Sequence, residues 1–221
     1  MAAVFVVVLM SAVLGLRAQE EMEICGLCPG NVRNSSQVTY LCSETSGAEL
    51  VGRCCVKPSG GDIIGLDLWN CSISLLDPGL RLTAAILVLD ISQNPLQDLR
   101  QEFFQGLTGL RYLALPGNIS CPGGNQAWAS VESELDSRIC QDQQSACNRT
   151  GDIAVLCPEN SLCAPDGPGY TQCVCADGFS GYKCLREGSF PLLVFFGILA
   201  SVTVTLSVLL WCTQRKKVKS L

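Results

Sequence analysis

Six cysteines lie close together near the carboxyl end of this chain, between Cys147 and Cys184. A segment of fewer than about forty residues buries too little apolar surface to offset the entropy lost on folding, so disulfides must hold it together. Spacing alone leaves the pairing open, and disulfides persist in oxidising compartments. An unbroken apolar run begins shortly after Cys184. The pattern therefore predicts an extracellular or lumenal disulfide module attached to a membrane segment.

The second half of this segment joins a Cys-x-Cys pair to a turn rich in glycine and aromatic residues, Cys173-Val-Cys175-Ala-Asp-Gly178-Phe179-Ser-Gly181-Tyr182-Lys-Cys184. Residues 143–185 thereby resemble an epidermal growth factor (EGF) module. The resemblance implies three disulfides, which are Cys147–Cys163, Cys157–Cys173 and Cys175–Cys184. Calcium-binding EGF modules carry carboxylates and amides before the first cysteine, where this chain has Gln-Gln-Ser-Ala. We therefore expect no calcium site.

Two apolar stretches predict the topology. Residues 1–18 have the short apolar run and small-residue ending of a secretory signal peptide. Residues 190–212 carry no charge, and at about 1.5 Å per residue they are long enough to cross a hydrocarbon core of about 30 Å. The basic tail, residues 213–221, marks the cytoplasmic side. We therefore predict a single-pass type I membrane protein.

Composition argues against several classes of function. All 20 acidic residues lie between the predicted signal peptide and the predicted span, so nucleic acid is not an expected partner. The chain has no histidine, the commonest general base and metal ligand, and it lacks phosphate-loop, dinucleotide and nucleophile-elbow motifs. Cys25 and Cys28 have the spacing of a zinc or redox site, but in a secreted cysteine-dense chain they are better interpreted as disulfide partners. We predict no enzyme, no cofactor and no metal.

Modification sites agree with this topology. N-glycosylation sequons begin at Asn34, Asn70, Asn118 and Asn148, all on the predicted lumenal side. Cys212 is the one cysteine at the cytoplasmic membrane boundary, where it is either palmitoylated or simply one more apolar residue. All other cysteines lie on the oxidising side, in an even number that permits complete pairing.

Residues 61–120 contain three segments with the Leu-x-x-Leu-x-Leu-x-x-Asn/Cys spacing of leucine-rich repeats. They are Ile63–Ile73, Ile86–Leu96 and Leu110–Asn118. Their closing Asn or Cys residues recur about every 23 residues, a length typical of that family. Each would form a short strand with Leu and Ile pointing inward, and its closing residue would hydrogen-bond the neighbouring coil. The alternative is an accidental match of a Leu-rich stretch to a loose template.

Cysteine-rich segments flank the predicted repeats. Residues 19–60 resemble an amino-terminal cap, and residues 121–141, with Cys121, Trp128 and Cys140, resemble a shortened carboxy-terminal cap. Neither pattern reveals its internal pairing. The expected fold class is thus a set of small disulfide-rich β modules, a short leucine-rich-repeat solenoid and one transmembrane α-helix.

Strand residues between the inward leucines would face outward as a ladder, where such proteins bind partners. The predicted partner-binding face comprises Asp67, Trp69, Asp90, Ser92 and Tyr112. Trp69 is either an exposed anchor or covered by the amino-terminal cap. Charge reversal at Asp67 and Asp90, or Trp69→Ala, should weaken partner binding and leave folding intact.

Five short motifs together resemble the family of all-trans retinoic acid-induced differentiation factors. They are Cys121-Pro-Gly-Gly, Cys157-Pro-Glu-Asn, Asp166-Gly-Pro-Gly, Cys175-Ala-Asp-Gly-Phe and Phe195-Phe196-Gly-Ile-Leu. The resemblance implies that the protein promotes differentiation of bone-forming cells, in part by binding a secreted EGF-repeat ligand. It also implies restraint of the cell cycle downstream of retinoic acid. It further implies association with a multipass lysosomal solute carrier that moves bisphosphonate-like anions to the cytosol.

Two hypotheses follow. In the first, the protein is a membrane glycoprotein that binds a protein ligand through its lumenal domain, and the module types favour this hypothesis. In the second, it is an accessory subunit of the transporter, which the short tail without signalling motifs favours. Residence at the cell surface, the lysosomal membrane or both is expected. Lys217 and Lys219 resemble a retrieval signal, which adds a perinuclear or endoplasmic reticulum pool, although the positive-inside rule also explains these lysines.

Overall fold

The computed structural model describes residues 24–58, 61–76, 82–134, 136–148, 157–188 and 192–219, so the predicted signal peptide, residues 1–18, lies outside the described chain. Contacts divide the chain into two units. The first contains the described residues up to 148 together with 163–172, and the second contains 157–162 and the described residues from 173 onward.

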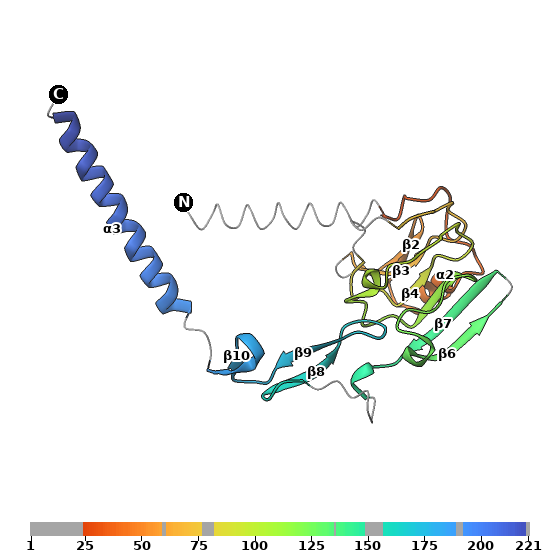
Figure 1. Ribbon diagram of the computed structural model, residues 1–221. Helices are drawn as coiled ribbons and strands as arrows, with labels where there is room; N and C mark the ends of the chain where they lie inside the picture. The colour runs from red at the N-terminus through yellow and green to blue at the C-terminus, as the bar shows by residue number, and fades with distance from the viewer. Residues whose placement is uncertain are drawn as a thin grey trace. The chain divides into compact units, whose positions relative to one another are not determined.

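The first unit contains a seven-stranded sheet in the order β1-β2-β3-β4-β5-β7-β6 (Figure 1). Its strands are β1 (Glu49–Val51), β2 (Cys54–Val56), β3 (Ile63–Asp67), β4 (Val88–Asp90), β5 (Tyr112–Pro116), β6 (Trp128–Ser133) and β7 (Ser137–Gln143). The central β3, β4 and β5 are parallel. Antiparallel strands extend the sheet on both sides, with β2 and β1 beyond β3 and with β7 and β6 beyond β5. The segments predicted as caps therefore contribute strands to the same sheet.

The parallel strands are aligned by their leucines. Leu66, Leu89 and Leu113 are direct neighbours in the register and are fully buried in one core cluster. The flanking inward positions are buried in the same cluster; they are Ile63, Leu68, Ile86, Ile91, Leu110 and Leu115. A parallel sheet needs a long connection between successive strands, which the spacing of these segments supplies.

Asn94 hydrogen-bonds the coil that precedes it. Its Oδ1 accepts from the backbone N–H groups of Cys71 and Ile73, at 3.0 Å each. Its Nδ2 donates to the backbone oxygen of Leu68 at 2.7 Å, and Asn94 is buried. Asn118, at the next closing position, is exposed, and among the described residues its side chain donates to the Leu96 oxygen alone, at 3.2 Å. Asn94 therefore satisfies more backbone groups than Asn118 does.

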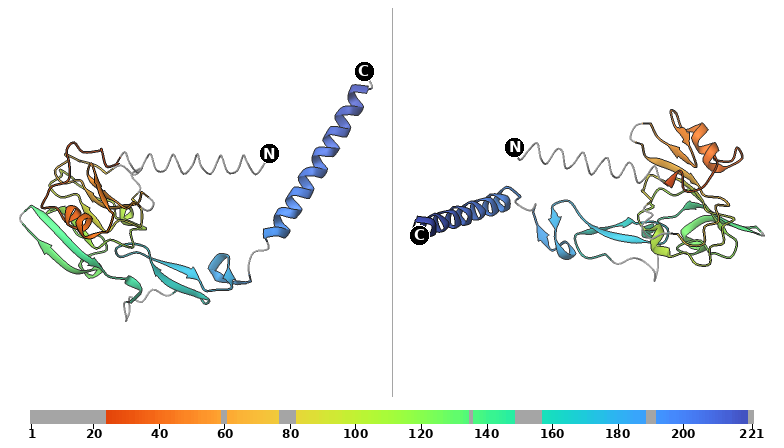
Figure 2. Two further views of the ribbon diagram at one scale, coloured as in Figure 1. Left: turned by 180° about the vertical axis from the view of Figure 1, so that it is seen from behind. Right: turned by 90° about the horizontal axis from the view of Figure 1, so that it is seen from above.

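Helix α2 (Gln37–Glu44) packs on the ladder side of the sheet, against β2, β3 and β4 (Figure 2). Ser36 caps its first turn by accepting from the Val38 N–H at 3.1 Å. Val38, Leu41 and Cys42 recur at helical spacing and give the helix one apolar face. A Cβ on Gly65 of β3 would lie 3.1 Å from Val38 Cγ1 and 3.3 Å from Leu41 Cδ2. Glycine at this position lets the helix approach the sheet closely.

Gly65→Val should lower the free energy of unfolding by about 2 kcal/mol, because its methyl groups overpack the contact between β3 and α2. Gly65→Ala, which adds one methyl group, should lower it by less. Denaturant titration measures both values, and hydrogen exchange should show faster exchange in α2 of the valine variant. A valine variant as stable as the parent chain would mean that α2 does not lie on the sheet.

Four of the disulfides in the first unit link segments around the sheet, and they are Cys25–Cys54, Cys42–Cys55, Cys28–Cys71 and Cys121–Cys140. Cys54 and Cys55 are adjacent on β2, so their side chains point to opposite faces of the sheet. Cys55 ties α2 to one face, and Cys54 ties the segment around Cys25 to the main core on the other. The Cys28–Cys71 disulfide joins the amino-terminal segment to the turn after β3.

The EGF-like segment consists of two small sheets, β8 (Ser161–Pro165) with β9 (Thr171–Cys175) and β10 (Phe179–Ser180) with β11 (Arg186–Glu187). Its disulfides are the three pairs that the EGF resemblance implies, Cys147–Cys163, Cys157–Cys173 and Cys175–Cys184. With so few strands, these covalent links take the place of a hydrophobic core.

The turn between β8 and β9 packs within the first unit. The backbone oxygen of Asp166 accepts from the Gly106 N–H at 3.0 Å, and its carboxylate accepts from Gln105 Nε2 at 2.9 Å. Gly123 and Gly169 touch backbone to backbone, since a Cβ on either glycine would clash with the backbone of the other. Both glycines have positive φ. The Cys-Pro-Gly-Gly and Asp-Gly-Pro-Gly motifs therefore meet at this contact.

Helix α3 (Leu192–Lys219) is long and apolar enough over Leu192–Trp211 to cross a membrane. The side chains of that segment are exposed throughout. The helix continues beyond the predicted span, through Lys219 of the predicted tail. This single apolar helix among the described residues is consistent with a single-pass membrane protein.

Candidate functional site

The candidate site lies where β3 and β4 end. Asp67 and Asp90 are neighbours in the register of the two strands and are 0% and 6% exposed. Ser92 is also buried. We predicted these three side chains on an open ladder, and this expectation is wrong. The segment that precedes the sheet in the sequence packs over these strand residues. The ladder is therefore covered by α2 and Arg33 and is not exposed to solvent.

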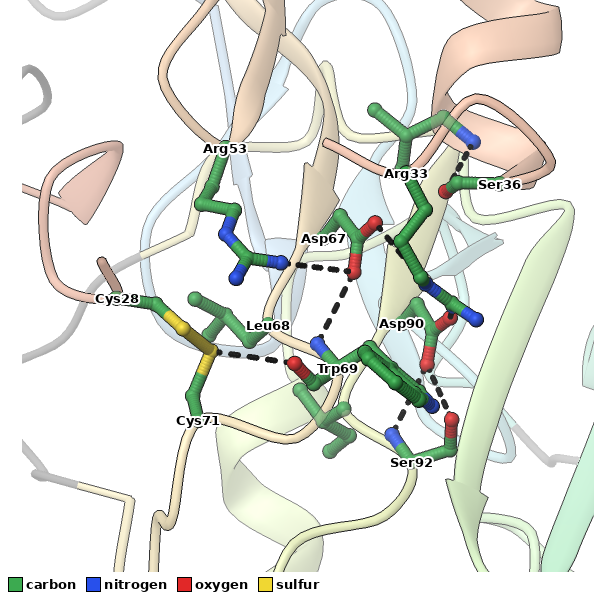
Figure 3. A network of polar contacts seen from close by, with 12 residues as sticks. Cys28, Arg33, Ser36, Arg53, Asp67, Leu68, Trp69, Cys71, Asp90 and Ser92 are labelled. Carbon is green, nitrogen blue, oxygen red and sulfur yellow. Dashed lines mark hydrogen bonds and ion pairs between the residues drawn. A yellow bond between two sulfur atoms is a disulfide. The ribbon is translucent and has the colours of Figure 1, made fainter. Parts of the chain in front are cut away.

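Arg33 binds both carboxylates (Figure 3). Its Nη2 lies 2.8 Å from Asp90 Oδ2, and its Nε lies 3.8 Å from Asp67 Oδ2. Its guanidinium stacks on Trp69, with Cζ 4.1 Å from the ring centroid. The Arg33 side chain remains 34% exposed, so it forms the outer layer of the network.

Arg53 approaches the same network from the turn between β1 and β2. Its Nη1 lies 4.0 Å from Asp67 Oδ1, and its Nη2 donates to the backbone oxygen of Pro29 at 2.8 Å. Two arginines thus face two aspartates, and the buried charge is balanced. Breaking such a network would leave a buried charge without its partner, so we assign it a structural role.

Each aspartate also stabilises the turn that follows its strand. Asp67 Oδ1 accepts from the backbone N–H of Trp69 at 3.0 Å. Asp90 Oδ1 accepts from the N–H of Ser92 at 3.0 Å and from its hydroxyl at 2.6 Å. The position of Trp69 is therefore fixed from both sides, by Asp67 through the backbone and by Arg33 on the ring.

Burial raises the pKa of Asp90, and the negative charge of Asp67 acts in the same direction. The hydrogen bonds from Ser92 and the charge of Arg33 oppose the shift without cancelling it. Burial likewise raises the pKa of Tyr112 on β5, and the negative charge of Asp90 adds to the effect.

The raised pKa of Asp90 gives a prediction for stability in acid. The folded chain holds this proton more tightly than the unfolded chain, whose aspartate has a pKa of about 3.9. Asp90 therefore contributes stability that grows as the pH falls through its folded pKa and is complete below about 3.9. In denaturant titrations, the parent chain should gain stability relative to Asp90→Asn across that window. A difference that shrinks in acid would contradict the raised pKa.

Trp69 and Tyr112 are the half-buried members of the predicted partner face. For Trp69 both interpretations hold in part, because Arg33 of the amino-terminal segment covers one side of a ring that stays partly exposed. Tyr112 packs beside the apolar cluster under α2. We call Arg33 and Trp69 together the rim, since they form the accessible edge of the network.

The asparagines of all four predicted glycosylation sites are exposed; they are Asn34, Asn70, Asn118 and Asn148. Asn70 adopts a left-handed φ of 50° in the turn that follows Trp69. Within the described residues, no three His, Cys, Asp or Glu side chains are grouped so as to hold a metal ion.

Sequence reasoning missed α2 and Arg33. The helix had a signal, because Ser36 is a good cap and Val38, Leu41 and Cys42 follow at helical spacing. Arg33 had none, since its partner Asp90 lies 57 residues further along the chain. A local pattern does not show which surface a loop arginine will cover.

The fold and site define a disulfide-rich β protein with an EGF-like domain and one candidate membrane-spanning helix. Residues 157–186 match the family model described as "ATRAID-like, EGF domain", and residues 192–217 match the "ATRAID C-terminal domain". The chain belongs to the family of all-trans retinoic acid-induced differentiation factors.

Three relatives bear that name. The protein of Homo sapiens is 48% identical over 92% of this chain and 88% of its own length. The protein of Mus musculus is 50% identical over 94% and 92%, and that of Danio rerio is 44% identical over 90% and 87%. No solved structure matches the chain.

Proposed function

We propose that this chain is a type I membrane glycoprotein that binds protein partners through its lumenal domain and promotes cell differentiation. The relatives are named as retinoic acid-induced differentiation factors, which supports a differentiation-related role. Within that role we propose action on bone-forming cells and restraint of the cell cycle. Helix α3 supports a membrane anchor, and the four exposed sequon asparagines support glycosylation. Residence at the cell surface, the lysosomal membrane or both is part of the proposal.

The proposed binding domain is a short leucine-rich-repeat-like unit. Three parallel strands in leucine register support this architecture, as do the hydrogen bonds of Asn94 to the preceding coil. Unlike an open repeat array, this unit has α2 on its ladder side. The repeat boundaries, 61–120 with caps at 19–60 and 121–141, belong to the same proposal.

The observation that carries the binding proposal is the rim. Trp69 presents a partly exposed indole whose position is fixed by Arg33 stacked on its face and by the buried aspartates beneath. Interfaces gain most of their affinity from a few aromatic and arginine side chains that need little ordering on binding. The proposed partner is a secreted protein built of EGF repeats.

A pull-down tests this function. Full-length chain in mild detergent and a secreted form that ends at Ser189 would each be incubated with medium and membranes from retinoic acid-treated bone-forming cells, and bound proteins identified by mass spectrometry. We expect both forms to capture the same secreted EGF-repeat protein. Trp69→Ala should reduce its capture at least about tenfold, as loss of an aromatic hot spot does. Leu162→Ala removes an exposed side chain from the EGF-like segment and is the matched control.

The accessory-subunit hypothesis gives a different outcome. Its support is α3, whose apolar side chains are exposed from Leu192 to Trp211, as expected of a helix that packs against other helices in a bilayer. Capture of a multipass lysosomal carrier by the full-length form alone, with no secreted ligand, would favour escort of a transporter for bisphosphonate-like anions. Equal capture of the secreted ligand by Trp69→Ala would contradict the rim as the binding site.

A further inference from the structure

The turn that ends the EGF-like segment exposes two large apolar side chains. Tyr182 is 81% exposed and Leu185 is 74% exposed, although both flank the buried Cys184. Aromatic and leucine side chains at such exposure mark contact surfaces when they are adjacent.

A backbone turn brings the two residues close together. Lys183 and Cys184 both have left-handed φ values, 53° and 58°, and the Leu185 N–H donates to the Tyr182 oxygen at 3.4 Å. This is a tight turn whose first and last Cα atoms lie within about 7 Å. Left-handed φ at two successive non-glycine residues is unfavourable, so surrounding structure must hold it. The Cys175–Cys184 disulfide and the pairing of β10 with β11 do so.

This surface carries basic side chains, although the net charge of the predicted lumenal part of the chain is negative. Lys183 lies within the turn, with its Nζ 5.4 Å from the Tyr182 ring centroid. Arg186 follows Leu185 and pairs with Ser180 across the β10–β11 ribbon. Glu187 is the next residue, but adjacent strand residues point to opposite faces, so it does not share the side of Arg186. The nearest other acidic residue in the sequence, Asp177, precedes β10.

The position in the chain limits what can cover this surface. Only residues 186–191 separate Leu185 from the start of α3, and a chain of that length reaches at most about 25 Å. The turn therefore stays near the bilayer that α3 crosses. Aromatic, aliphatic and basic side chains together match the membrane–water boundary, where Tyr sits at the headgroups and Lys and Arg reach lipid phosphates.

We propose that Tyr182, Lys183, Leu185 and Arg186, the juxtamembrane patch, rest on the lipid surface from which α3 emerges. Tyr182 and Leu185 enter the boundary between headgroups and acyl chains, and Lys183 and Arg186 contact phosphates. The patch holds the last EGF turn against the bilayer in addition to the covalent tether. This inference rests on α3 crossing a membrane, as in the proposed function.

Photo-crosslinking tests the inference on the full-length chain. The chain is placed in nanodiscs of phosphatidylcholine and phosphatidylserine in a three-to-one ratio, doped with a phospholipid that carries a diazirine near the glycerol end of its acyl chain. After irradiation and proteolysis, mass spectrometry locates the lipid adducts. We expect adducts on residues 182–186 as well as on α3. Tyr182→Ser with Leu185→Ser should lower the adducts on the patch at least about fivefold and leave those on α3 unchanged.

Two controls sharpen the test. Leu162→Ser removes another exposed leucine of the same segment, 66% exposed, and should leave the adducts on the patch unchanged. Lys183→Gln with Arg186→Gln should lower them in the mixed lipid more than in phosphatidylcholine alone. Adducts on α3 without adducts on 182–186 would overturn the inference and leave the membrane anchor intact. Absence of adducts on α3 itself would overturn both the inference and the proposed membrane anchor.

Discussion

Arg33→Ala should lower the free energy of unfolding of the first unit by about 3 kcal/mol, the low end of the range for breaking a buried ion pair. The variant removes the cation that lies 2.8 Å from Asp90. Asp67 then has one remaining cation, Arg53, at 4.0 Å. Both carboxylates are buried, so the cost is that of unpaired charge in a poorly hydrated site. An ordinary surface pair would give less than about 1 kcal/mol.

Arg33→Lys is the matched control, because it keeps the charge and loses the planar group that reaches both carboxylates and stacks on Trp69. The free energy of unfolding of Arg33→Lys should lie between those of the parent chain and Arg33→Ala. Denaturant titration with intact disulfides gives the free energies. A loss below about 1 kcal/mol for Arg33→Ala would show that Arg33 is a surface residue and that the ladder is not sealed by it.

Asn94→Ala should lower the free energy of unfolding about as much as Arg33→Ala does, by about 3 kcal/mol. The buried Asn94 side chain satisfies the N–H groups of Cys71 and Ile73 and the oxygen of Leu68, and its removal leaves all three without that partner. Each such group costs about 1 kcal/mol or more when it is unsatisfied. Unfolding by denaturant, followed by circular dichroism, measures the change.

Asn118→Ala is the natural comparison, because it is the closing residue of the next segment but donates only to the Leu96 oxygen. It should lose about 1 kcal/mol or less. Both variants belong in a Ser120→Ala background, in which the sequon at Asn118 is absent and glycosylation cannot differ between them. Equal losses for the two asparagines would mean that Asn94 does not hold the preceding coil.

The spacing of leucines predicted where the central strands lie, because inward apolar residues in such a pattern are a local property of the sequence. Leu66, Leu89 and Leu113 stand in register for that reason. The covering of the ladder is not local. It depends on a loop arginine that meets aspartates far along the chain, and on the Cys28–Cys71 link between two regions that looked like separate modules. Cysteine spacing leaves such pairings open.

This difference changes which variants are informative. Charge reversal at both Asp67 and Asp90 was expected to weaken partner binding and spare the fold. With both carboxylates buried against arginines, reversal would place four cations together and should unfold the first unit. Loss of binding in such a variant would therefore say nothing about the partner face. Trp69→Ala, at the accessible rim, is the variant that addresses binding.

Carboxyl footprinting tests most directly whether the ladder is covered and only its rim is accessible. The native full-length chain is treated with a water-soluble carbodiimide and glycine ethyl ester, and labelling of each carboxylate is followed by mass spectrometry. We expect Asp67 and Asp90 to stay unlabelled while the exposed Asp98 and Glu132 react, and Arg33→Ala to make Asp90 reactive. If Asp67 and Asp90 of the parent chain were labelled as fast as Asp98, the ladder would be open. That result would contradict the burial of both carboxylates beneath α2 and Arg33.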